Sequence, residues 1–294
     1  MLFKSMKRRD ENFNKRCLTG TDMESDRKTI VYFHLERGQN AKKHFWNTFR
    51  MPCVNIDMGE EYELLFYKVP EFYGGGQPWD KQRLLEVLST QLEQTEAWDY
   101  YLQPDLSSLL EIKEKLPPEI LLHKVVKQNL CWEYLFLIGW NAADDEFGEE
   151  GSFQRIDAME EQKNIFAVLL QKYLPRINHF TVVTDRPEMY MDFTDYVYEE
   201  YGIPAAYVNK LEKRLGKNKK TVILDGRRRY VPPYAAIPEE ASYIDFWSEN
   251  EKRRVLETKR KDVRYLSTVK FLDTLAKNGY NTRVNQTHIQ AENK

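Results

Sequence analysis

Short apolar runs alternate with amphipathic segments through the second half of the chain. The runs are rich in β-branched and aromatic residues, which is typical of strands in a sheet that is covered on both faces. The segments between them repeat apolar residues every three or four positions, which predicts helices that bury one face. The runs that predict strands are 133–140, 178–185, 203–208, 220–225, 242–246 and 263–266.

This alternation predicts the α/β class, with a mostly parallel sheet between two layers of helices. The expected architecture is a three-layer Rossmann-like or flavodoxin-like domain over residues 131–284, with a helix over residues 152–174 in its first crossover. Many unrelated functions use this class, so the class assigns no activity by itself.

The first part of the chain mixes strand and helix patterns, and we expect it to form an N-terminal α+β region over residues 28–130. The two ends of the whole chain differ from this pattern. We expect residues 1–27 to be a polar, disordered leader and residues 285–294 to be a loose tail. The predicted strands of the first region are 28–35 and 62–69, and its predicted helices are 79–102, 106–116 and 120–130.

Composition says more about the compartment of the protein than about its function. The 294 residues include 44 Lys and Arg against 46 Asp and Glu, so the net charge of −2 points to no polyanionic partner. The three cysteines are far apart in the sequence, which favours a reducing compartment. No stretch of about 18 apolar residues is present, so we expect a soluble cytoplasmic protein with no membrane partner.

Candidate chemistry lies where the predicted strands end, because ligands of parallel sheets bind beyond the carboxyl ends of the strands. Carboxylates that converge there can hold Mg²⁺, and neighbouring arginines can bind phosphate. Asp245 lies close to the end of the fifth of these strands. The polar residues at the other strand ends are Asn141, Asp144, Asp145, Thr184, Asp185, Arg186, Asp225, Arg227 and Arg228.

A simpler interpretation gives the same carboxylates local roles. Asp185 and Glu188 have the spacing of a capping box, with Pro187 in the first helical turn. Asp144 and Asp145 belong to an acidic loop. Asp225 is followed by Gly226, a common turn dipeptide.

The sequence lacks the motifs of several other classes of binding site. No strand end carries G-x-G-x-x-G, which argues against NAD or FAD, and the five histidines are isolated, which argues against zinc. The basic segment 251–266 interleaves acidic residues at i,i+4 spacing and lacks aromatic residues between its lysines. Such a segment is typical of a solvated helix face, so nucleic acid is not the expected partner.

Our leading hypothesis is therefore a non-catalytic binding or regulatory module for a small anionic ligand or a protein partner, without a cofactor. The alternative is a magnesium-dependent phosphoryl-transfer or phosphodiester enzyme that uses the strand-end aspartates. The sequence leaves open whether the protein is an enzyme. The candidate ligand-binding residues are Asp144, Asp145, Asp185, Arg186, Asp225, Arg227 and Arg228.

Overall fold

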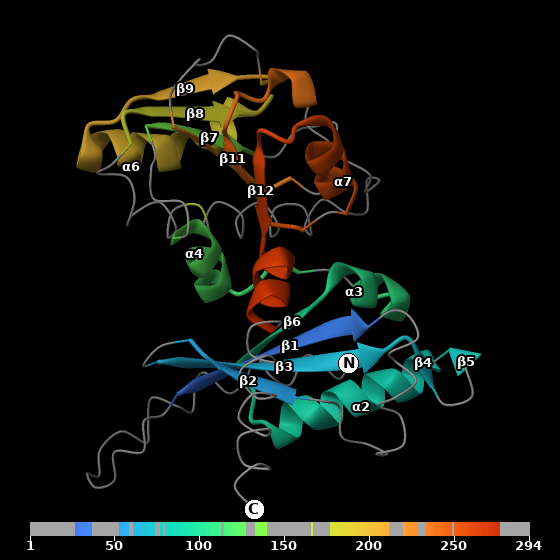
Figure 1. Cartoon of the computed structure of the whole chain (residues 1–294). Coiled ribbons are helices and arrows are strands. Elements are labelled where there is room, and N and C mark those ends of the chain that lie inside the picture. Colours follow the sequence, from blue (N-terminus) through green and yellow to red (C-terminus); the bar gives the residue numbers. More distant parts are fainter. Residues whose placement is uncertain are drawn as a thin grey trace, which may run out of the picture. The chain divides into compact units, whose positions relative to one another are not determined.

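The contacts of the chain divide it into two compact units. Residues 1–114 and 276–294 form one unit, and residues 115–275 form the other. Figure 1 shows the helices and strands of both units in a computed structural model of the chain. The structure describes residues 27–36, 53–58, 61–73, 77–78, 80–112, 115–127, 133–139, 166, 177–211, 220–227, 233–248 and 250–276.

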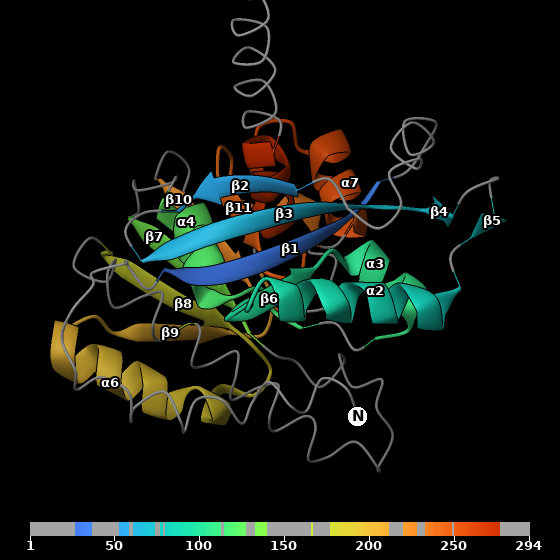
Figure 2. The same ribbon diagram turned by 90° about the horizontal axis from the view of Figure 1, so that it is seen from below.

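The first unit is built on a four-stranded sheet. Its elements are β1 (Lys28–Glu36), β2 (Cys53–Asp57), β3 (Tyr62–Pro70), β4 (Phe72–Tyr73), β5 (Gln77–Pro78), α2 (Lys81–Gln94), β6 (Asp99–Leu102) and α3 (Pro104–Leu110). The strand order is β2-β3-β1-β6, in which β1 is parallel to β3 and β6, and β2 is antiparallel to β3 (Figure 2). Alternate residues of β1, among them Val31 and Phe33, pack in one core cluster with leucines of α2 and α3.

The predicted helix over residues 79–102 is wrong in its last third. Helix α2 ends at Gln94, and Glu96 takes a left-handed conformation with φ 48°. Residues 99–102 then pair with the edge of β1 as the parallel strand β6. A helical spacing of apolar residues is a weak signal when an open sheet edge supplies backbone hydrogen bonds.

The second unit contains six parallel strands. Its elements are α4 (Glu119–Lys127), β7 (Tyr134–Ile138), β8 (His179–Val183), η7 (Pro187–Met189), α6 (Met191–Tyr201), β9 (Ala205–Val208), β10 (Thr221–Asp225), η8 (Tyr234–Ala236), β11 (Ser242–Asp245), α7 (Asn250–Lys259) and β12 (Arg264–Ser267), followed by a helical segment 268–276. The strand order is β12-β11-β10-β7-β8-β9, which is 6-5-4-1-2-3 in chain order. This is the order of a doubly wound α/β sheet, and its switch point lies between β7 and β10.

Helices cover both faces of this sheet. One core cluster joins residues of the sheet, such as Leu135 and Val182, to apolar residues of α4 and α6. A second cluster joins the opposite sheet face, including Ile223 and Tyr243, to Leu256 of α7. The mostly parallel α/β class predicted from the sequence is therefore confirmed, with the sheet between two layers of helices.

The boundary between the units differs from the one expected after residue 130. The contacts place residues 115–127 in the second unit. The reason is the apolar face of α4, because Leu122 and Val125 belong to the same core cluster as Leu135 of β7. The expected leader, the tail and the helix over residues 152–174 fall mainly outside the described residues.

Three helix ends show how capping works in this unit. Gly202 ends α6 in the left-handed conformation with φ 68°, and Ser267 Oγ accepts a hydrogen bond from the backbone N–H of Lys270. The capping box at Asp185 is absent, since the chain first forms the short helix η7 and Thr184 Oγ1 accepts the N–H of Arg186 instead. No helix within the described ranges is long and apolar enough to cross a membrane.

Gly139, at the end of β7, gives a test of this packing. A Cβ added there would lie 2.4 Å from the hydroxyl oxygen of Tyr190, which is buried. We expect Gly139→Ala to lower the free energy of unfolding by about 1–3 kcal/mol, measured by urea denaturation. The loss should shrink in a Tyr190→Leu background, and a strictly additive double mutant would contradict the clash.

Candidate functional site

Two carboxylates lie side by side where the strands of the second sheet end. Asp225 of β10 is in register with Asp245 of β11, and Asp245 is in register with Ser267 of β12. Because side chains alternate along a strand, both carboxylates share the face of Ile223 and Tyr243, which α7 covers. Both aspartates are fully buried.

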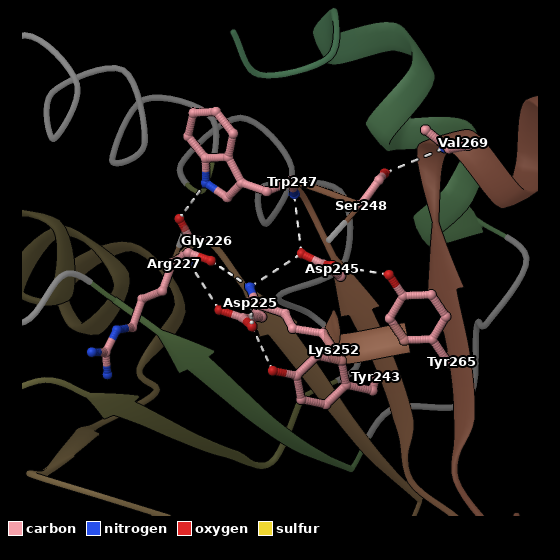
Figure 3. A network of polar contacts seen from close by, with 10 residues as sticks. All are labelled: Asp225, Gly226, Arg227, Tyr243, Asp245, Trp247, Ser248, Lys252, Tyr265 and Val269. Carbon is pink, nitrogen blue, oxygen red and sulfur yellow. Dashed lines mark hydrogen bonds and ion pairs between the residues drawn. The ribbon is translucent and has the colours of Figure 1, made fainter. Parts of the chain in front are cut away.

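Lys252 of α7 places its ammonium group between these carboxylates (Figure 3). Its Nζ lies 2.8 Å from Asp225 Oδ2 and 3.3 Å from Asp245 Oδ1, and it also donates a hydrogen bond to the backbone carbonyl of Arg227. Lys252 is itself 0% exposed. An ammonium group has three donors, and these three oxygens match that number.

Neutral donors add further hydrogen bonds to the two carboxylates. Asp225 accepts hydrogen bonds from the Tyr243 hydroxyl and, at 2.9 Å, from the backbone N–H of Arg227. Asp245 accepts from the backbone N–H of Trp247 at 3.1 Å and from the Tyr265 hydroxyl at 2.9 Å. All four carboxylate oxygens therefore have donors within the protein.

This arrangement has a defined charge. With both carboxylates ionised, two negative charges and one positive charge are buried together, and the four neutral hydrogen bonds offset the cost of removing the carboxylates from water. Burial, together with the nearby Asp245 carboxylate, raises the pKa of Tyr265. The phenol thus stays protonated and continues to donate to Asp245 at neutral pH.

The same network holds the chain that leaves β10. The indole N–H of Trp247 donates to the Gly226 carbonyl at 2.8 Å, while the N–H of Gly226 donates to the Ile138 carbonyl at 3.1 Å. Arg227 is fixed through both its N–H and its carbonyl group. Its side chain, 6% exposed as a residue, points away from the two carboxylates in Figure 3.

The other sequence-predicted residues lie elsewhere or outside the described ranges. Asp185 and Arg186 are exposed just after β8, and β7 separates β8 from β10 in the sheet. Within the part of the chain that the structure describes, no three His, Cys, Asp or Glu residues are grouped as a metal site would require. Asn141, Asp144, Asp145 and Arg228 are not among the described residues.

Lys252 is the central residue that the sequence did not identify. It lies in a strongly charged segment that we interpreted as a solvated helix face. One signal was available: Leu256 follows Lys252 by four residues, so both belong to the same face of α7, and Leu256 is buried. Tyr243 and Tyr265 each lie two residues before a strand end, and strand periodicity places them on the face of the carboxylates.

Comparisons with known proteins add little to this geometry. No protein-family model matches the chain, and no curated protein matches it. One solved structure with some likeness is the ligand-free aspartate transcarbamoylase from Trypanosoma cruzi. It is 9% identical, with a TM-score of 0.34 over 90% of this chain and 84% of the other, and so low a likeness assigns no activity here.

Replacing Lys252 tests the buried network. Lys252→Met keeps most of the side-chain volume but leaves two carboxylates buried without their cation. We therefore expect the free energy of unfolding, measured by urea denaturation, to be about 3–5 kcal/mol lower. Lys259→Met, at an exposed position of the same helix, should cost less than about 1 kcal/mol.

A further variant separates the stability that Lys252→Met loses through charge from the stability that it loses through packing. Adding Asp225→Asn and Asp245→Asn to Lys252→Met removes both uncompensated carboxylates, and we expect this triple variant to recover part of the lost stability. If Lys252→Met costs no more than Lys259→Met, the ion pairs do not stabilise the fold.

The raised pKa of Tyr265 predicts a dependence on alkaline pH. In the unfolded chain this phenol loses its proton near pH 10, its ordinary pKa, whereas the folded protein keeps it. The free energy of unfolding should therefore fall above pH 10, and in Tyr265→Phe it should fall less steeply by about 1.4 kcal/mol per pH unit. Urea denaturation of both proteins at several pH values measures this difference, and parallel curves would contradict it.

Proposed function

We propose that the protein is a non-catalytic binding protein that holds a small anionic ligand at the carboxyl edge of its second sheet. Its compartment is the cytoplasm in this proposal, which the scattered cysteines support. The observation that supports ligand binding most directly is the fixation of Arg227 beside the switch point between β7 and β10. In doubly wound sheets the switch point is where ligands bind.

The arginines at this edge favour an anion. Arg227 follows β10 and Arg186 follows β8, so the two arginines come from the strands on either side of β7. Arg228, the next residue in the sequence, lies outside the described residues. Arginine binds phosphate and carboxylate groups through paired hydrogen bonds, which gives both affinity and orientation.

The magnesium-dependent alternative has less support. A metal ligand needs an oxygen that is free to face the ion, but both oxygens of Asp225 accept hydrogen bonds and one also contacts the Lys252 ammonium. A divalent cation bound beside that ammonium would meet electrostatic repulsion. The carboxylate and Lys252 are better explained as the support that positions Arg227.

Calorimetric titration with inorganic phosphate, pyrophosphate, citrate, a nucleoside monophosphate and a sugar phosphate tests the proposal. We expect at least one of these anions to bind, and Arg227→Gln to weaken that binding about tenfold, because a hydrogen bond to a charged group is lost. Arg264→Gln is the matched control. Arg264 is the first residue of β12, so it lies where the parallel strands begin and not where they end.

Three results would contradict the proposal. The first is that none of the five anions binds. The second is that Arg227→Gln binds the anion as tightly as the unchanged protein while both show the same thermal unfolding. The third is magnesium-dependent turnover of a phosphate ester that a single strand-end substitution abolishes, which would establish an enzyme instead.

A further inference from the structure

A second surface of the same unit exposes large apolar side chains. Six such side chains are exposed among the described residues, and four of them lie on α6 and β9. Isolated exposed apolar residues are ordinary, whereas a group of them marks a contact surface. The four are Met191 (50% exposed), Tyr196 (37%), Tyr198 (60%) and Tyr207 (36%).

Thr194 of α6 links this helix to Tyr207 of β9. The hydroxyl of Thr194 hydrogen-bonds the Tyr207 hydroxyl and also donates to the Met191 carbonyl at 2.9 Å. Tyr198 follows Thr194 by four residues, which places it on the neighbouring turn of the same helix face. Helical spacing places Met191 and Tyr198 on one side of α6, and Thr194 on that side contacts Tyr207 of β9, so we group Met191, Tyr198 and Tyr207 as the tyrosine patch.

The helix beside the tyrosine patch is strongly acidic. Helix α6 carries four acidic residues, all exposed, and no basic residue. Asp195 lies four residues after Met191 and three before Tyr198, so it borders the patch directly, and Glu199 lies one turn further. The four acidic residues are Asp192, Asp195, Glu199 and Glu200.

Strand β9 adds an open backbone edge. It is the last strand of the six, and among the described strands it pairs with β8 alone. Its burial is partial, and Ala206 and Tyr207 are exposed. An edge strand presents N–H and C=O groups to which another extended segment can bind.

We propose that this surface binds an extended, basic segment of a partner protein, which adds as a strand along β9. Lysine or arginine side chains of that segment would lie over Tyr198 and Tyr207 and pair with Asp195 and Glu199. Backbone hydrogen bonds would supply affinity, and the acidic helix would select positive charge.

A second copy of this chain fits the same edge less well. Pairing β9 with its own copy about a two-fold axis would bring two α6 helices toward one another. Each helix carries four carboxylates without a basic residue, so the approach would be repulsive. A basic partner removes this repulsion, which is why charge favours it.

A labelled peptide of about eight residues that alternates arginine and valine tests the proposal by fluorescence polarisation at low salt. We expect it to bind the full chain, and we expect Asp195→Asn with Glu199→Gln to weaken binding roughly tenfold. Glu239→Gln with Glu251→Gln removes two exposed carboxylates elsewhere in the unit and should leave the affinity unchanged.

Two further peptides separate strand addition from attraction between charges. A peptide with glutamate in place of arginine should not bind. A peptide with N-methylated amides keeps its charge but cannot form a full ladder, so it should bind at least about fivefold more weakly.

The proposal fails if the Asp195 and Glu199 variant, with unchanged circular dichroism, binds as tightly as the control variant. It also fails if N-methylation has no effect, since binding would then need no strand. A dimer of the unliganded chain in sedimentation that Tyr198→Ser dissociates would assign the surface to a second copy and would likewise overturn it.

Discussion

The buried ammonium group of Lys252 is the interaction on which the second unit depends. Asp225 and Asp245 are in register on neighbouring strands and both face α7, so without a cation their charges would repel one another in a medium that screens poorly. The ammonium joins β10, β11 and α7 through side chains and the segment after β10 through a carbonyl. One side chain therefore joins four parts of the fold, and its removal would leave two buried carboxylates without a cation and the Arg227 carbonyl without this donor.

That arrangement also limits what the carboxyl edge of the sheet can do. The strand ends are where chemistry is expected in this architecture, yet the two carboxylates found there already have partners for every oxygen. A metal ion or a proton that approached these carboxylates would compete with those partners. The network also positions Arg227, whose guanidinium belongs to a class of group that stays charged and pairs with carboxylate and phosphate groups.

The sequence predicted the strands of this unit well because each is a run of β-branched and aromatic residues between polar segments. It failed where tertiary contacts override local pattern: residues 99–102 fit a helix by spacing but pair with β1 instead. It also failed for Lys252, because a lysine between Glu251 and Arg253 resembles its solvated neighbours. Only the shared face with Leu256 distinguishes it, and a pattern of two residues is too short to reverse a charged composition.

Charged residues of opposite sign are separated between two surfaces of this unit, the carboxyl edge of the sheet and the surface of α6 and β9. The net charge of the chain is nearly zero, but all charged residues of α6 are acidic, whereas the ends of β8 and β10 carry arginines beside the aspartates Asp185 and Asp225. A small anion is therefore repelled by α6 and attracted to the arginines, and a basic segment experiences the opposite field. Under the two proposals, one sheet therefore offers two surfaces to partners of opposite charge, and salt should weaken both interactions together.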